Sequence, residues 1–231
     1  MKTVIPNSKR KIYWEIIKRL SLKTIIFNFK YFKPGIALKL PVLLSRNVQL
    51  KQIKGKVIID GDIKPGMITI GFSDVGIFDY KRSKAIWNVS GKIIFKGKAL
   101  IGQGSKISVE ESGELIFGEN IKITAETNIV ALSKIEFGKN CLLSWEILIM
   151  DDDFHSIINT EDGTYFPQSK PVYIGNNVWI GCKTTILKGS YIPDNCIIGA
   201  NSLVCKKMEY PNCLYAGNPL ELKKRNVEWI F

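Results

Sequence analysis

The chain has 231 residues, of which 45% are hydrophobic and 23% are charged, the balance of an ordinary globular protein. Its 33 Lys and Arg residues exceed its 21 Asp and Glu residues, so the net charge is +12. The sequence contains no zinc-finger spacing, basic zipper or RNA-binding motif. We therefore expect no nucleic-acid partner. One histidine and five cysteines without a CxxC pair exclude a clustered metal site and favour a reduced, cytoplasmic chain without a metal cofactor.

Residues 1–47 are expected to form an N-terminal helical or capping segment. Within them, residues 11–32 (KIYWEIIKRLSLKTIIFNFKYF) are both apolar and basic, and the charges break the apolar run too often for a membrane span. No secretory signal with its cleavage site is present. Two interpretations of residues 11–32 stay open: a helix packed on the end of the next domain, or a helix lying on an anionic membrane surface.

Residues 48–209 are expected to form a solenoid of short parallel strands. From residue 174 onward an aliphatic residue recurs every six positions, a period that neither a helix nor a simple alternating strand produces (Ile174, Ile180, Ile186, Ile192, Ile198, Val204). A small residue or valine follows four positions after each of the first five (Val178, Thr184, Ser190, Cys196, Ser202). A triangular coil accounts for this period, with one six-residue unit on each side and a small inward residue at each corner.

A longer repeat indicates the length of one coil. The segments LIFGENIKI (115–123), IEFGKNCLL (135–143) and VYIGNNVWI (172–180) each place glycine, then asparagine, after an aromatic or aliphatic residue. Gly and Asn adopt left-handed backbone conformations at low cost, so they mark corners. Phe95, Phe117 and Phe137 are separated by 22 and 20 residues, which indicates one coil per 18 to 25 residues and about seven coils between residues 50 and 206. Residues 210–231 are expected to form a C-terminal tail.

The repeat is interrupted at residues 151–171, which we expect to emerge as a loop with a functional role. His155, the only histidine, begins this loop within the sequence DDDFHS. Imidazole titrates near neutral pH and suits a general base, although a loop histidine can also be bonded only to backbone. Asp153 is the preferred candidate among the three aspartates to orient His155, and the alternative is a solvated loop charge.

The motifs DxDFH, KPVYIGNNVWIGCKTTILKGSYIPDNCIIGANSLV and YAGNP together resemble the hexapeptide-repeat acyltransferases, whose fold is a left-handed parallel β-helix. The similarity is greatest to sugar and polysaccharide O-acetyltransferases such as maltose and galactoside acetyltransferases, and it covers roughly residues 115–224. The resemblance implies an all-β solenoid enzyme that uses acetyl-CoA. It also implies a homotrimer with active sites between subunits.

The resemblance assigns roles to individual residues. His155 would take the proton from an acceptor hydroxyl, and Trp179 and Gly181 would lie near the thioester end of the cofactor. The Cys182 N–H would stabilise the thioester oxygen. The remaining cofactor contacts would follow along the coil toward the nucleotide (Ala200, Asn201, Cys205, Lys206, Asn218, Pro219, Lys224). Glu221 departs from the family's pattern, because a basic residue often stands there.

The predicted function is therefore transfer of acetyl from acetyl-CoA to a sugar hydroxyl of a bacterial surface polysaccharide or its precursor. An N-acetyltransferase acting on an amino sugar or antibiotic is the alternative within the fold, and a non-catalytic scaffold or glycan-binding protein is the alternative outside it. The expected location is cytoplasmic, with peripheral membrane contact through residues 11–32 as a further possibility.

Overall fold

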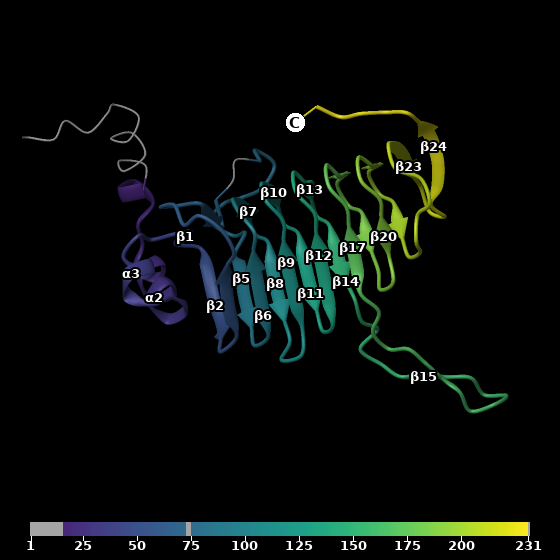
Figure 1. The fold of residues 1–231 in the computed structure, drawn as a ribbon, viewed down its shortest axis with the longest axis horizontal. Coiled ribbons are helices and arrows are strands. Elements are labelled where there is room, and N and C mark those ends of the chain that lie inside the picture. The colour runs from purple at the N-terminus through teal and green to yellow at the C-terminus, as the bar shows by residue number, and fades with distance from the viewer. Residues whose placement is uncertain (1–15, 73–74, 231) are drawn as a thin grey trace, which may run out of the picture.

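A computed structural model describes residues 16–72 and 75–230. Its main body is a triangular coil in which the chain passes in turn through three sheets of parallel strands, so that each sheet takes one strand per coil; one antiparallel strand follows the last coil (Figure 1). This is a left-handed parallel β-helix of hexapeptide repeats, as expected from the sequence. Within the described residues, no helix is long and apolar enough to cross a bilayer.

The nine-stranded sheet contains, in order, β1 (Val42–Leu44), β4 (Ile68–Ile70), β7 (Ala99–Gln103), β10 (Ile121–Ala125), β13 (Leu142–Trp145), β18 (Trp179–Ile180), β21 (Ile197–Ile198), β23 (Cys213–Ala216) and β24 (Glu221–Arg225). The seven-stranded sheet contains β2 (Val48–Ile53), β5 (Ala85–Val89), β8 (Lys106–Val109), β11 (Asn128–Ala131), β14 (Leu148–Met150), β19 (Thr185–Ile186) and β22 (Leu203–Val204). The six-stranded sheet contains β3 (Lys56–Ile59), β6 (Lys92–Phe95), β9 (Glu114–Phe117), β12 (Lys134–Phe137), β17 (Val172–Ile174) and β20 (Tyr191–Ile192). The coil thus begins at Val42, earlier than the expected residue 48.

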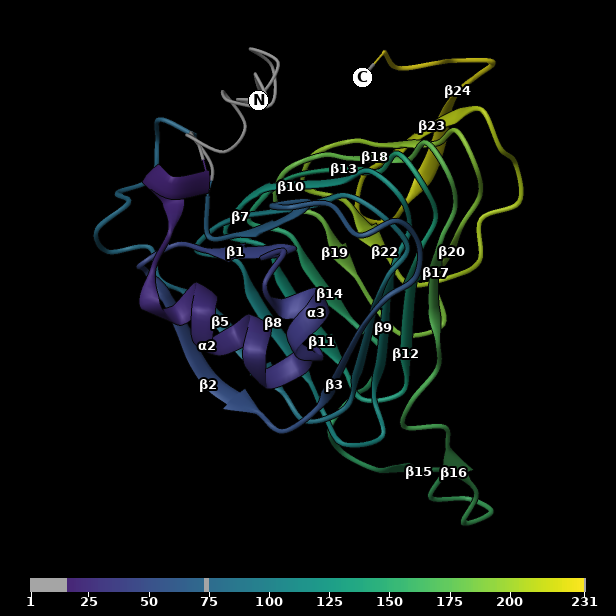
Figure 2. The same cartoon turned by 60° about the vertical axis from the view of Figure 1, so that its left-hand side comes forward.

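Three corners join these sheets, and we number them in chain order. The first corner joins the nine-stranded to the seven-stranded sheet and contains Gly181-Cys182 and Ala200-Asn201. The second joins the seven-stranded to the six-stranded sheet and contains Lys188-Gly189. The third joins the six-stranded to the nine-stranded sheet. Because the cross-section is a triangle, the second corner lies opposite the face of the nine-stranded sheet (Figure 2).

The core consists of side chains that recur at equivalent positions in successive coils. All six aliphatic residues of the six-residue series between Ile174 and Val204, and all five small residues between them, are buried, as predicted. The rings of Phe95, Phe117 and Phe137 stack at centroid distances of 5.2 and 5.5 Å, which confirms that the 22- and 20-residue separations each span one coil. Stacked aromatic rings add to the free energy of apolar burial.

Asparagines form a hydrogen-bonded column along the third corner. Asn120, Asn140, Asn177 and Asn195 all have positive φ, the conformation that asparagine tolerates better than most residues. Their side-chain amides bond from coil to coil at 3.1, 3.1 and 2.9 Å. The C-terminal tail runs back over this column, and Trp229 Nε1 donates to Asn177 O at 2.7 Å (Figure 1).

The N-terminal end of the coil is closed by α2 (Leu22–Tyr31) and α3 (Pro34–Ala37), which lie across it (Figures 1 and 2). Ser21 caps α2 by accepting from Thr24 N. The buried side chains of Thr24 and Asn28 bond the backbone groups along the free edge of β1: Asn28 with Val42, and Thr24 with Leu44. An unpaired strand edge promotes association with other chains. The Thr24 and Asn28 side chains prevent this by bonding the free backbone N–H and C=O groups of β1. The helix therefore packs on the end of the coil.

Candidate active site

The segment of residues 151–171 leaves the coil at the second corner and carries a short antiparallel hairpin of β15 (Ile157–Ile158) and β16 (Tyr165–Phe166) (Figure 2). We call it the hairpin loop. Its first residue, Asp151, is fully buried and accepts from Leu132 N at 2.8 Å and Ser133 N at 2.9 Å in the preceding coil. Burial raises the pKa of Asp151, although these hydrogen bonds act in the opposite direction. Asp151 therefore fixes the start of the loop to the coil.

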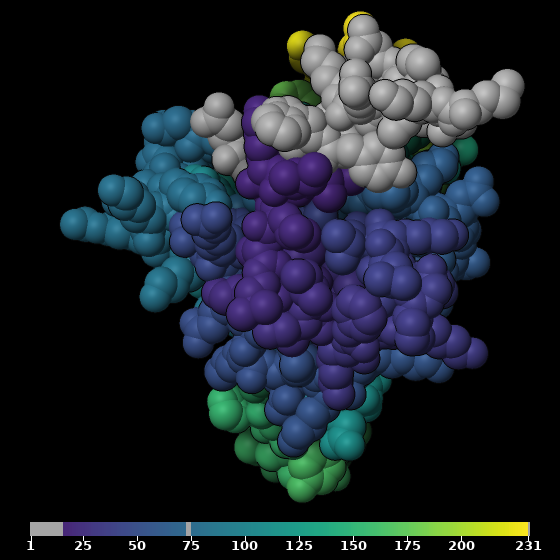
Figure 3. Space-filling view, turned by 90° about the vertical axis from the view of Figure 1, so that its left-hand side faces the viewer, coloured from purple at the N-terminus to yellow at the C-terminus, as the bar shows by residue number. Residues whose placement is uncertain are grey.

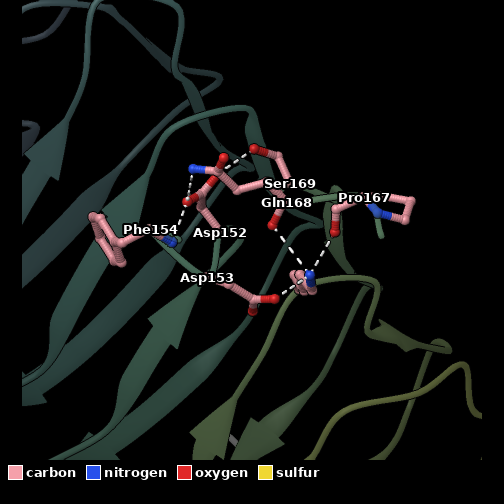
Figure 4. A network of polar contacts seen from close by, with 7 residues as sticks. Asp152, Asp153, Phe154, Pro167, Gln168 and Ser169 are labelled. Carbon is pink, nitrogen blue, oxygen red and sulfur yellow. Dashed lines mark hydrogen bonds and ion pairs between the residues drawn. The ribbon is translucent and has the colours of Figure 1, made fainter. Parts of the chain in front are cut away.

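Asp152 ties the two ends of the hairpin loop together. Its carboxylate accepts from Phe154 N at 2.5 Å, from Gln168 Nε2 at 3.2 Å, and from the hydroxyl of Ser169 (Figure 4). Burial would by itself raise the pKa of Asp152, but the hydrogen bonds and the charge of Lys188 together lower it below its ordinary value. The outgoing and returning strands of the loop are thus joined by an ionised carboxylate.

Lys188 joins the loop to the next coil. Its ammonium pairs with the Asp153 carboxylate and donates to Pro167 O at 2.6 Å and Gln168 O at 3.2 Å (Figure 4). These bonds reach both the outgoing and the returning strand, so one side chain of the coil fixes the base of the loop. The sequence reasoning missed Lys188, which is 35 positions from Asp153 and occupies an ordinary corner position in the repeat.

His155 follows directly on this fixed base, and its side chain is exposed. The preceding residue, Phe154, has a φ of 63°, so the chain turns sharply before the histidine. In the described part of the chain no group hydrogen-bonds to the His155 imidazole. The Asp153 carboxylate, the predicted orienting partner of His155, forms an ion pair with Lys188. The backbone on the N-terminal side of His155 is held by the loop base, and its imidazole is open to solvent.

Trp179 lies on the opposite side of the prism from the hairpin loop. It is 37% exposed on the outer face of β18, where Nε1 donates to Ser144 Oγ at 3.2 Å and the ring packs on Trp229 at a centroid distance of 6.3 Å. The nine-stranded face and the second corner are opposite each other, so a single prism does not bring His155 to Trp179 (Figure 2).

Gly181, Cys182, Ala200 and Asn201 lie together at the first corner, in successive coils. Asn201 N donates to Cys182 O at 2.8 Å, and a Cβ at Gly181 would lie 2.6 Å from Ala200 N, so only glycine fits there. Within the described residues, neither the Cys182 N–H nor the Ala200 N–H has an acceptor. These two amides provide backbone donors at the surface beside Trp179.

The turn of residues 216–219 continues the same corner into the next coil. Gly217 N donates to Ser202 Oγ at 3.0 Å, and Leu203 N donates to Gly217 O at 3.1 Å. Asn218 and Pro219 are exposed at the tip, and Lys224 is exposed on β24. Lys223 pairs with Glu221 at 2.7 Å, so the two side chains neutralise each other. Residues 181–182, 200–201 and 217–219 thus form a continuous track parallel to the coil axis.

Cys205 and Lys206, the other two predicted cofactor contacts, lie instead at the second corner. They line a hollow of about 890 Å³ whose remaining walls are basic, aromatic and small residues (Lys170, Pro171, Tyr173, Lys188, Gly189, Ser190, Tyr191, Lys207). This hollow adjoins the base of the hairpin loop, because Lys188 belongs to both. The predicted site residues therefore divide into two groups on one chain: the first-corner track with Trp179, and the second-corner hollow with His155.

Comparisons with known proteins agree with this architecture. Residues 171–206 match the family described as bacterial transferase hexapeptide (six repeats). An uncharacterized 24.8 kDa protein in the cps region of Klebsiella pneumoniae is 28% identical over 209 residues, covering 90% of this chain and 89% of that protein. The polysialic acid O-acetyltransferase of Neisseria meningitidis is 39% identical over 104 residues, covering 45% and 48% of the two chains.

Among solved structures, the polySia specific acetyltransferase NeuO superposes with a TM-score of 0.52 at 21% identity, covering 80% of this chain and 89% of that one. This likeness supports the fold, while the sequence matches support the family. The chain therefore contains a bacterial-transferase hexapeptide repeat over residues 171–206, is similar in sequence to a polysaccharide O-acetyltransferase over part of its length, and folds as a left-handed parallel β-helix.

Proposed function

We propose that the protein transfers an acetyl group from acetyl-CoA to a hydroxyl group of a bacterial surface polysaccharide or its precursor. The observation that carries this proposal is the exposed His155 imidazole on a loop whose base is fixed by Asp152 and Lys188. The sequence relative from Neisseria meningitidis, named as a polysialic acid O-acetyltransferase, supports the acceptor class. The free amides at the first corner support the thioester as donor.

In the proposed reaction, His155 accepts the proton of the acceptor hydroxyl as its oxygen attacks the thioester carbonyl carbon. A positioned general base contributes roughly 10²–10⁴-fold to such a step. The Cys182 N–H donates to the carbonyl oxygen as negative charge develops on it. When the intermediate collapses, the carbon–sulfur bond breaks, and the departing thiolate takes the proton from the imidazolium. No covalent bond to the enzyme forms.

Acetyl-CoA fits the first-corner track by the chemistry of the groups along it. The thioester end would lie near Trp179 and Gly181, and the pantetheine amides would pair with backbone at Ala200 and Asn201. Asn218, Pro219 and Lys224 would border the nucleotide end. In this arrangement Cys205 and Lys206 would contact the acetyl-CoA held by a neighbouring copy, because they lie at the other corner of their own chain.

We propose a homotrimer on the same geometric ground. Catalysis needs the His155 imidazole within hydrogen-bond reach of the acceptor hydroxyl beside the thioester, and one prism holds His155 and Trp179 on opposite sides. A second copy can supply the missing half of each site, and three-fold symmetry repeats this contact without leaving open ends. A cytoplasmic location is part of the same proposal, because acetyl-CoA, the proposed co-substrate, is an intracellular metabolite.

The first experiment compares His155→Ala with Ser156→Ala, a neighbouring exposed position on the same loop. His155→Ala should bind coenzyme A as the wild type does in calorimetry, and should lose acetyl transfer by about 10²–10⁴-fold. Ser156→Ala should retain transfer. Near-normal turnover by His155→Ala would refute the mechanism. If the wild type did not bind coenzyme A, a glycan-binding scaffold would be favoured. A preference of the wild type for amine acceptors would favour an N-acetyltransferase.

The second experiment tests whether two copies share a site. Trp179→Ala and His155→Ala chains, each weakly active alone, are co-expressed and purified as mixed oligomers. Interfaces that pair the intact His155 of one copy with the intact Trp179 of another should recover activity. A mixture no more active than its separate components would refute the shared site while leaving the reaction itself unaffected.

A further inference from the structure

The positive charge of the protein is concentrated in the N-terminal part of its sequence. Residues 1–59 contain fourteen of the 33 Lys and Arg residues but only one of the 21 Asp and Glu residues. The remaining 172 residues have a net charge of −1. Between Ile16 and Ile59, which form the helical cap and the first coil, ten residues are basic and none is acidic. The surplus therefore lies far from the proposed nucleotide end, and cofactor phosphates do not account for it.

The helix α2 at this end has two different faces. Its inner face, with Thr24, Phe27 and Asn28, is buried against the first coil. Its outer face carries an apolar row at helical spacing: Leu22 is 72% exposed, Ile26 46% and Phe29 48%, with Ile25 beside them. Leu38, just after α3, is also 72% exposed. A helix that only capped the coil would need a polar outer face, and this one is apolar.

Cations surround the apolar row without acidic partners. Lys30, Lys33 and Lys39 are exposed, and none of them forms an ion pair with the residues that the structure describes. Lys23 has a different function, because its ammonium donates to Arg46 O and Val48 O on the first coil. In the space-filling view of this end, the cap residues drawn in purple cover the middle of the face (Figure 3). The outer surface of α2 is thus part of the end face of the prism.

We propose that this end face binds the surface of an anionic lipid bilayer, with the apolar row inserted at the headgroup level. An apolar stripe bordered by lysines is the pattern of helices that lie in the membrane interface. A soluble polyanion would pair with the lysines but would leave the apolar row in water. A second copy docked end to end would bring its own ten cations against these, so charge repulsion opposes it. The inference is independent of the acetyl-transfer chemistry.

The test is co-sedimentation of the full-length protein with vesicles of phosphatidylcholine alone or mixed with phosphatidylglycerol. The wild type should bind the mixed vesicles, bind the neutral ones far more weakly, and be released by salt. Leu22→Gln combined with Ile26→Gln should weaken binding at least about tenfold. The control is Ile230→Gln, which removes an apolar side chain that is 95% exposed over the third corner, away from this end face, and should change nothing.

A second pair of variants tests the charges. Replacing three lysines of the end face by glutamine should weaken binding on the order of a hundredfold, since each lysine near an anionic surface contributes about fivefold (Lys30, Lys33, Lys39). Three exposed lysines on other parts of the coil serve as the control with the same change of net charge (Lys98, Lys122, Lys139). Circular dichroism and acetyl transfer to a soluble acceptor should be unchanged in all variants.

The proposal is overturned if the wild type fails to bind the mixed vesicles. It is also overturned if the apolar double variant binds as well as the wild type, because binding would then be attraction of any polyanion. A loss of oligomer size in the apolar double variant, measured by light scattering, would identify the face as an interface between copies instead. Equal loss in the lysine variant and its control would show a dependence on net charge alone.

Discussion

The Asn28 side chain connects the N-terminal cap to the coil, and Asn28→Leu tests how much this connection stabilises the fold. Its Nδ2 donates to Val42 O at 2.7 Å, and its Oδ1 accepts from Val42 N at 3.2 Å. Both residues are fully buried, so water cannot replace these bonds. In the variant, two backbone groups of β1 lose their partners.

Each buried backbone group left without a partner costs about 1–3 kcal/mol, so the two cost about 2–6 kcal/mol. Leucine returns roughly 0.5 kcal/mol through its higher helix propensity. The free energy of unfolding should therefore fall by about 2–5 kcal/mol. For a chain of this length, that corresponds to a Tm lower by roughly 5–15 °C.

Urea unfolding followed by circular dichroism measures the change, and amide hydrogen exchange across residues 42–48 shows whether the loss is at the predicted edge. Lys30→Leu is the control, because it places the same residue on the exposed side of the same helix. That variant should stay within roughly 0.5 kcal/mol of the wild type. A loss below about 1 kcal/mol in Asn28→Leu, or equal losses in both variants, would refute the reasoning about the strand edge.

Two further predictions follow from titratable groups. The folded pKa of Asp152 lies below the unfolded value of about 3.9, so its stabilisation of the hairpin loop is complete above that value and is lost as the pH falls through the folded pKa. Hydrogen-exchange protection of residues 152–169 should drop on acidification below about pH 4, and Asp152→Asn should lack that protection at neutral pH; protection in the variant equal to the wild type would contradict this. Burial raises the pKa of the Cys141 thiol to about 12, whereas Cys205 is exposed. Iodoacetamide at about pH 8 should therefore alkylate Cys205 and spare Cys141 in the native protein, as mass spectrometry can determine, and rapid alkylation of Cys141 would show that the coil opens there.

The coil was predictable from sequence because its constraints repeat. Every sixth residue after Ile174 meets the same environment, and the phenylalanines stack because equivalent positions of successive coils are in contact. In a periodic structure, the same pattern of buried residues occurs many times in the sequence. The start of the coil was less predictable, since β1 has no strand before it and its edge is paired by side chains of a helix.

The details of the site depend on contacts that occur only once and therefore leave no repeating pattern in the sequence. Sequence reasoning placed His155 on an emergent loop, and the structure has it there. The pairing of Asp153 with Lys188 joins residues of two coils and follows from how the loop folds back, which local spacing does not determine. The division of the predicted cofactor contacts between two corners was likewise not predictable, because residues a few positions apart in sequence lie on different sides of the triangular coil.

The break in the repeat leaves the lattice of the coil intact. Before and after the hairpin loop the strands stay in register, with β12 paired to β17 and β14 paired to β19. The hairpin loop is therefore an insertion into a continuous coil, and its length and composition can vary without changing the pairing of the strands on either side. Under the proposed function, a foreign hairpin grafted between Asp151 and Lys170 would change the acceptor preference and leave the first-corner track unchanged.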